Sequence, residues 1–172
     1  MATTNNGTSE REDLLAALAK QRYFLRFTTR ELTDEQAAKR TTVSQLCLAG
    51  LIKHVAAVEQ RWARFIVEGP SVMAYDPAAM AGEWMDLFRM VDGETLAGLL
   101  DRYEQVAADT VELVRALPDL DAAQPLPDAP WFEKGVSWSA RRVLLHIIGE
   151  TAQHAGHADI IREALDGAKS MG

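Results

Sequence analysis

Apolar residues recur at steps of three and four positions over four long segments of the chain, and this spacing is what most restricts its fold. Such spacing gathers apolar side chains on one face of an α-helix, whereas a half-buried β-strand alternates apolar and polar residues. No segment keeps a period of two over a convincing length. We therefore expect an all-α protein in which four amphipathic helices pack as a four-helix bundle.

Capping motifs and helix-breaking residues set the expected limits of these helices. The patterns Ser9-x-x-Glu12 and Thr42-x-x-Gln45 have the form of capping boxes, and each precedes an apolar run. The limits expected from these signals are about 10–31 for the first helix, about 43–67 for the second, Asp92-Gly93 to Pro118 for the third and about 139–166 for the fourth.

Long connections are expected between helices two and three and between helices three and four. Residues 69–91 are rich in Met and aromatic side chains, so we expect them to pack over the bundle, with one short helix at about 78–90. Residues 118–137 are rich in Pro and Asp and indicate a loop. We expect Trp62 and Trp84 in the core or in a covering segment, where either could line a pocket.

The length and charge of the chain narrow its class of function. A chain of 172 residues can bury the core of one domain, and we expect residues 1–172 to form one, with residues 1–8 disordered. The formal net charge of −7, from 18 basic and 25 acidic residues, argues against a nucleic-acid or membrane partner. The sequence shows neither a secretory signal nor an apolar run long enough to cross a bilayer, so we expect a cytoplasmic protein.

A carboxylate and an imidazole fall on the apolar face of the fourth helix. On a helical wheel, Glu150 and His154 lie about 20° either side of the centre of the apolar stripe that includes Val143, Ile147 and Ile161. A buried carboxylate is costly unless it is paired or bound to a metal, and residues four apart lie side by side on a helix. Glu150 and His154 could therefore share one metal ion.

The second helix offers a third ligand, because His54 lies in the middle of its apolar seam. If the second and fourth helices face each other, His54, Glu150 and His154 converge into a set of two imidazoles and one carboxylate, with coordination positions left for water or substrate. Two alternatives stay open from spacing alone: His54 is an ordinary core histidine, or Glu150 is a buried, hydrogen-bonded carboxylate without a metal. Zinc, nickel, iron and manganese all suit the proposed donor set.

The other histidines and the single cysteine are expected to have supporting roles. His157 lies about 40° from the stripe centre and His146 about 60° from it, so His157 is the better candidate to orient a ligand from outside the coordination shell. His146 is expected at a boundary between helices. Cys47 precedes His54 by two turns, about 10 Å, and is expected to be a small core residue. Arg162 is expected on a solvated face.

Two strings of residues resemble a known family. Residues 149–167, GETAQHAGHADIIREALDG, and residues 51–62, LIKHVAAVEQRW, are similar to the DinB-like superfamily of metal-binding four-helix bundles. The similarity is closest to the branch related to mycothiol-dependent maleylpyruvate isomerase. It implies a divalent metal, often zinc or nickel, bound by the residues that match the family's motif: His54, Glu150 and His154.

The resemblance also implies a metal-dependent enzyme of the thiol S-transferase or isomerase type. Such an enzyme acts on a small-molecule substrate with a low-molecular-weight thiol such as mycothiol, which the metal activates. A metal-dependent hydrolase is one alternative. Another is a non-catalytic, stress-related bundle whose metal is closed off by a fourth ligand, His157 or His146. Oligomeric state stays open, with a homodimer through the unused faces of the first and third helices as one option.

Overall fold

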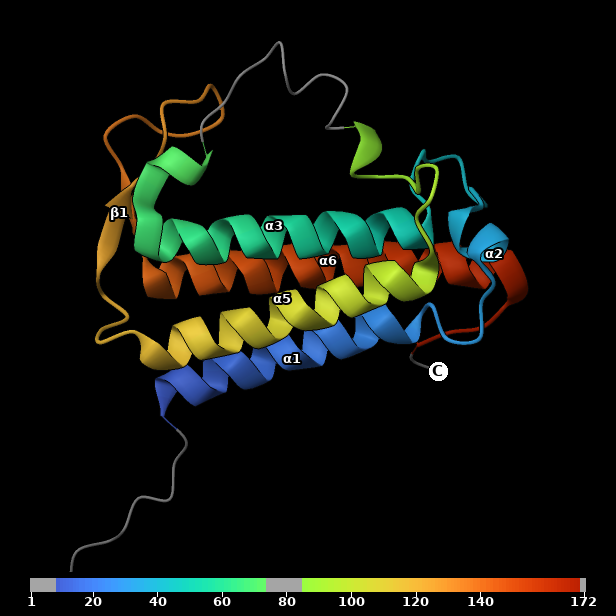
Figure 1. Cartoon of the computed structure of the whole chain (residues 1–172), viewed down its shortest axis with the longest axis horizontal. Helices are drawn as coiled ribbons and strands as arrows, with labels where there is room; N and C mark the ends of the chain where they lie inside the picture. Colours follow the sequence, from blue (N-terminus) through green and yellow to red (C-terminus); the bar gives the residue numbers. More distant parts are fainter. Residues whose placement is uncertain (1–8, 74–84, 171–172) are drawn as a thin grey trace, which may run out of the picture.

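Four long helices lie side by side along the molecule and form a bundle, as the apolar spacing predicts (Figure 1). The computed structural model describes residues 9–73 and 85–170. Within them, α6 packs against α1 and α3, and α5 packs against α3 and α1. The long helices are α1 (Glu10–Phe27), α3 (Leu48–Glu68), α5 (Leu96–Ala116) and α6 (Ala140–Asp166). The shorter elements are α2 (Asp34–Ala38), the 3₁₀ helix η1 (Gly69–Met73), β1 (Ala123–Pro125) and β2 (Ser137–Ser139).

Two apolar clusters fill the bundle, and a buried ion pair lies between them. One cluster includes Leu25 and Val55, and the other includes Leu18 and Trp62. Between these positions, Arg22 of α1 donates to Glu59 of α3 through Nε at 3.0 Å and through a second guanidinium nitrogen. Burial of a charge is tolerated when it is paired and hydrogen-bonded, and this pair links α1 to α3 inside the bundle.

The first helix ends earlier than its apolar spacing predicts. α1 stops at Phe27, and the hydroxyls of Thr28 and Thr29 each donate at 2.7 Å to a carbonyl three residues before them. The turn that follows is held by Arg162, whose Nη1 donates at 2.8 Å to the carbonyls of Thr28 and Arg30. The expected solvated position of Arg162 is therefore wrong: its side chain is buried by contacts with a segment distant in sequence.

The expected start of the second long helix is also wrong. α3 begins at Leu48, and its N-cap residue makes no side-chain hydrogen bond. Thr42 does not cap it: its Oγ1 accepts from the Ser44 amide at 3.2 Å, within a local turn. Gln45 instead accepts a hydrogen bond from Arg40 at 2.5 Å. The sequence pattern of a capping box thus occurs here without the helix that it usually starts.

A true capping box lies earlier, at α2, which the apolar spacing misses. Thr33 Oγ1 accepts from the Gln36 amide at 3.3 Å, and Gln36 Oε1 accepts from the Thr33 amide at 2.9 Å. A five-residue helix is too short for a periodic apolar pattern to identify. α2 packs against α3 at one end of the bundle (Figure 1).

The first long connection is only partly described, whereas the second is described throughout. Residues 78–84 of the helix expected at about 78–90 lie outside the described residues, as do Trp84 and residues 1–8. In the second connection, β1 and β2 pair antiparallel, with Gln124 opposite Trp138. Strands of three residues are too short to show an alternating pattern, so the expectation of a plain loop missed them. Ser139, the last residue of β2, caps α6 by accepting from the Arg142 amide.

Candidate metal centre

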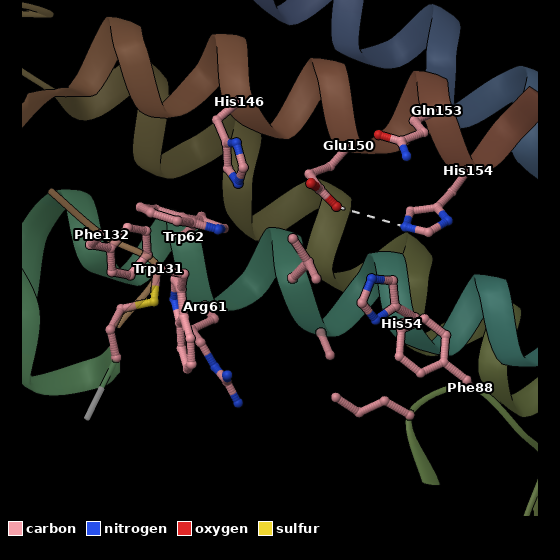
Figure 2. A pocket seen from close by; sticks show the side chains of 14 residues that line it. His54, Arg61, Trp62, Phe88, Trp131, Phe132, His146, Glu150, Gln153 and His154 are labelled. Carbon is pink, nitrogen blue, oxygen red and sulfur yellow. Dashed lines mark ion pairs between the residues drawn. The ribbon is translucent and has the colours of Figure 1, made fainter. Parts of the chain in front are cut away.

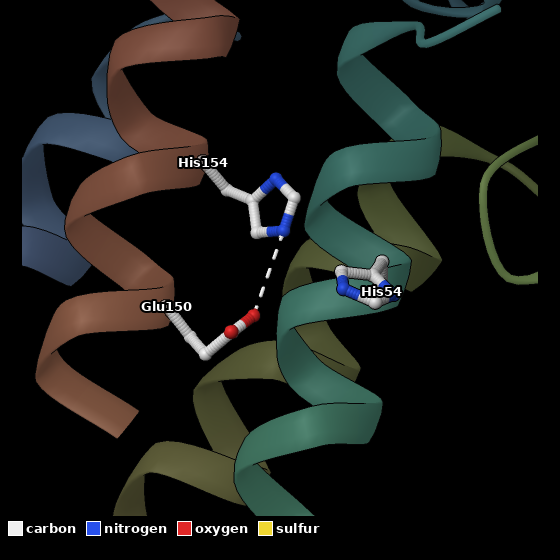
Figure 3. Close-up of side chains that lie close together, drawn as sticks. All are labelled: His54, Glu150 and His154. Atoms are coloured by element: carbon white, nitrogen blue, oxygen red, sulfur yellow. Dashed lines mark ion pairs between the residues drawn. The ribbon is translucent and has the colours of Figure 1, made fainter. Parts of the chain in front are cut away.

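His54, Glu150 and His154 meet where α3 faces α6 (Figure 3). Each offers one ligand atom, and these atoms all lie within 4.8 Å of one another. His154 Nε2 is 3.7 Å from Glu150 Oε2, and the rings of His54 and His154 are 4.8 Å apart between centroids. Within residues 9–73 and 85–170, no other group of three His, Cys, Asp or Glu side chains is arranged to hold a metal.

The geometry follows from two uninterrupted helices. α6 extends without a break from its Ser139 cap to Gly167, which ends the helix with φ of 79°. Glu150 and His154 therefore stay one helical turn apart on the same face. His54 projects toward them from the seam of α3, which packs along α6.

Burial keeps the imidazoles in the form that binds metal. His54 is 4% exposed, and the side chains of His154 and Glu150 are 12% and 31% exposed. Burial lowers the pKa of His54 to about 4, with a smaller contribution from His154. Burial likewise lowers the pKa of His154 to about 4, assisted by His157. Two neutral imidazoles beside a carboxylate form a donor set that fits a divalent cation without first losing protons at neutral pH.

Neighbouring side chains fix the orientation of both imidazoles. His154 Nδ1, the ring nitrogen turned away from Glu150, lies 3.4 Å from Nδ1 of His157. The Phe88 ring stacks on His54 with a centroid distance of 4.1 Å and an angle of 24°. Gly50 permits this stacking, because a Cβ at residue 50 would overlap the backbone carbonyl of Phe88. The segment that carries Phe88 can therefore lie directly on α3.

A cavity of about 440 Å³ opens beside the three side chains (Figure 2). α3 and α6 supply much of its lining, and both long connections add aromatic or aliphatic walls, including Phe88, Trp131 and Phe132. Trp62 stacks on Trp138 of β2, with centroids 5.0 Å apart. The short hairpin therefore supports the wall of the cavity that is most distant from His54.

The other two histidines and the cysteine lie outside the cluster of His54, Glu150 and His154. His146 lines the cavity, where its ring lies 4.7 Å from the Trp62 ring, and burial lowers its pKa. Neither His146 nor His157 belongs to the three-residue cluster. Cys47 is buried, its Sγ lies 3.7 Å from the Phe88 carbonyl, and it does not line the cavity.

Sequence reasoning missed Arg61 as a residue of this site, and it missed the contact between Phe88 and His54. Arg61 lines the cavity and could have been found, because it follows His54 by seven residues and so lies on the same face of α3. Phe88 could not have been found in this way, since its contact with His54 joins a connecting segment to a helix.

Comparison with known proteins supports the resemblance seen in the sequence. The family model described as mycothiol-S-transferase matches residues 13–167. The fold resembles that of YfiT from Bacillus subtilis, which is described as a probable metal-dependent hydrolase with an unusual four-helix bundle topology. The TM-score is 0.65 and the sequence identity is 17%, and the match covers 95% of this chain and 91% of YfiT. It also resembles a conserved protein from Enterococcus faecalis, with TM-score 0.60, 14% identity and coverage of 94% of this chain and 100% of that protein. No curated protein matches the chain.

Proposed function

The chain belongs to the mycothiol S-transferase family, a DinB-like family. From this premise we propose that it is a divalent-metal-dependent enzyme. It transfers a low-molecular-weight thiol, such as mycothiol, to an electrophilic small molecule. One observation carries the proposal: His54, Glu150 and His154 converge at the edge of a cavity large enough for a small molecule. Metal donors beside such a cavity are the arrangement that a substrate-activating metal requires.

We assign the metal to His54, Glu150 and His154, with zinc or nickel as the expected ion. The donor set supports this assignment, because it combines neutral nitrogen ligands with one carboxylate in a partly buried site. When bound, such a cation supplies Lewis acidity that lowers the pKa of a thiol at the site and makes a thiolate available as nucleophile.

The other side chains at the site orient the two imidazoles and shield a bound substrate from water. His157 contacts the ring nitrogen of His154 that faces away from Glu150, so it can fix the orientation of the His154 ring. Phe88 does the same for His54 by stacking. Trp62 and Phe132 offer apolar surface that displaces water from around a substrate. Cys47 lies outside the cavity, which supports a thiol that comes from a cofactor.

Metal content and thiol dependence together test the proposal. The purified protein should contain close to one equivalent of a divalent metal by elemental analysis, and a chelator should remove activity that the metal restores. With 1-chloro-2,4-dinitrobenzene as electrophile, product formation should require both the metal and mycothiol. A protein that carries no metal, or that gives no rate above the uncatalysed reaction with any small thiol, would contradict the proposal.

Two further measurements separate the alternatives. Turnover of ester or amide substrates that needs the metal but no thiol would indicate a hydrolase, because the metal would then activate water. A crystal structure in which His146 or His157 completes a closed, four-ligand site would indicate a non-catalytic metal. An open coordination position facing the cavity would support the enzyme.

A further inference from the structure

Arg61 lies on the cavity wall at a distance from the metal-binding side chains. It follows His54 by two helical turns on α3, which is about 10 Å along the helix axis. Both residues line the same cavity. In Figure 2 the Arg61 side chain lies beside Trp131, in a different part of the cavity from His54 and Phe88.

The charge of Arg61 is not neutralised by any residue that the structure describes. The other basic side chains of α3 each have a carboxylate partner: Lys53 lies 2.7 Å from Glu94, and Arg64 lies 2.7 Å from Glu68. Arg61 has neither a hydrogen bond nor an ion pair in residues 9–73 and 85–170. Arg61 is therefore the one basic residue of α3 without a carboxylate partner among the described residues.

The cavity is therefore polarised along its length. Among the described lining residues, Glu150 is the only carboxylate, and it lies beside His154. Arg61 is the only arginine or lysine there, and its neighbours on the wall are aromatic or aliphatic. Such a cavity suits a molecule with an apolar body and an anionic end.

We propose that Arg61 binds an anionic group, a carboxylate or a sulfonate, on the electrophilic substrate. A guanidinium offers two parallel N–H donors to such a group, and its charge favours an anion over a neutral analogue of the same shape. The apolar body then lies along Trp62 and Phe132, and the electrophilic carbon points toward His54 and His154. This inference rests on the proposed function for the reaction, although the binding of the anion by Arg61 does not require the metal.

The reaction at the other end is a simple displacement. The thiolate sulfur forms a bond to the electrophilic carbon, and a leaving group such as chloride departs with its bonding electrons. The proton of the thiol passes to solvent. Arg61 takes no part in these bond changes, so it acts on substrate affinity and not on the chemical step.

The first test measures binding without turnover. 1-Naphthylacetate and its neutral analogue 1-naphthylacetamide are titrated into the protein while the tryptophan indole N–H signals are followed by NMR, with metal bound and again after chelation. Both forms of the unmodified protein should bind the acid about 10-fold more tightly than the amide. Arg61→Gln should lose this preference, whereas Arg64→Gln, a nearby exposed arginine on the same helix, should keep it.

The second test identifies which reactant carries the anion. Thiol transfer is measured with the acidic 4-chloro-3,5-dinitrobenzoate and with the neutral 1-chloro-2,4-dinitrobenzene, each losing chloride. Arg61→Gln should raise KM about 10-fold for the acidic aryl chloride alone, with kcat and the KM for the thiol unchanged. An effect on the KM of the thiol alone would overturn the assignment of the anion to the electrophile.

The two failures can be told apart. If no thiol supports turnover but the acid preference depends on Arg61, the proposed function fails and the anion site stands. If turnover needs thiol and metal but Arg61→Gln binds the acid as tightly as the unmodified protein does, the proposed function stands and this inference is wrong. Loss of the preference in Arg64→Gln as well would also overturn it, because the effect would then reflect general charge.

Discussion

Nδ1 of His154 lies 3.4 Å from Nδ1 of His157, on the side of the ring opposite to the nitrogen that faces Glu150. Imidazoles that bind metals are commonly held in place by a hydrogen bond at their second nitrogen. His157 follows His154 by three residues on α6, so one helix carries both the proposed ligand and the residue proposed to orient it.

Removal of this support should weaken metal binding without abolishing it. We expect His157→Ala to lower metal affinity by about 10- to 100-fold, because the His154 ring loses the contact that orients it. Competition with a chromophoric chelator measures the change. Gly156→Ala is a suitable control, since a Cβ there meets nothing within 4 Å. Equal affinities in the two variants would show that His157 does not orient the ligand.

Removal of a proposed ligand should have a larger effect. Glu150→Ala and His154→Ala should each purify without metal while keeping most of their helix content, because both side chains lie at the edge of a cavity and not in the packed core. Elemental analysis and circular dichroism provide the two readouts. Glu163→Ala removes an exposed carboxylate from the same helix and should retain the metal. Full metal occupancy in both ligand variants would refute the assignment.

The stability of the metal-free protein should fall as the pH decreases from about 6.5 to about 4. The folded chain holds the pKa of His54 and His154 at about 4, mainly through burial, whereas histidines of an unfolded chain titrate near 6.5. Within this window the unfolded state binds more protons, so acidification favours unfolding. Urea denaturation at several pH values measures the slope. Replacement of both histidines by glutamine should flatten it, and an unchanged slope would contradict the prediction.

Gly50→Ala should disturb the site from outside it. The new Cβ would overlap the Phe88 carbonyl, so the segment that stacks Phe88 on His54 must move away from α3. We expect a loss of about 1–3 kcal/mol in the free energy of unfolding, together with weaker metal binding. Gly149→Ala controls for helix propensity, because a Cβ at residue 149 meets nothing within 4 Å. Matching behaviour of the two variants would show that the close contact at Gly50 is unimportant.

The buried ion pair of Arg22 and Glu59 should matter to stability and not to metal binding. We expect Arg22→Met to cost about 3–5 kcal/mol, because it leaves the Glu59 carboxylate buried without its partner. The double variant Arg22→Met with Glu59→Leu should recover much of this loss, since no charge then remains buried. Thermal denaturation measures both variants. A double variant no more stable than Arg22→Met would indicate that packing, and not charge, dominates.

Much of the architecture could be predicted because helical periodicity is a local property. The order Glu150-x-x-x-His154 places two donors on one face of any helix that contains it, and the seam of α3 places His54 on the face that meets other helices. The limits of α6 follow in the same way, because Ser139 and Gly167 act within a single turn.

Other features depend on contacts between distant segments, which no local pattern encodes. Arg162 has the sequence surroundings of an exposed residue, yet it is buried because the turn after α1 offers it carbonyl acceptors. Thr42 has the surroundings of a helix cap, yet α3 starts at Leu48.

The sequence by itself therefore determined the bundle and the set of residues that could bind a metal. Only the tertiary structure decided that His54 approaches Glu150 and His154, that Phe88 covers His54, and that Arg61 lies on the cavity wall without a carboxylate partner among the described residues. The reason is physical: periodicity fixes which face of a helix is apolar, whereas the packing of helices and connections against one another fixes what each side chain on that face meets.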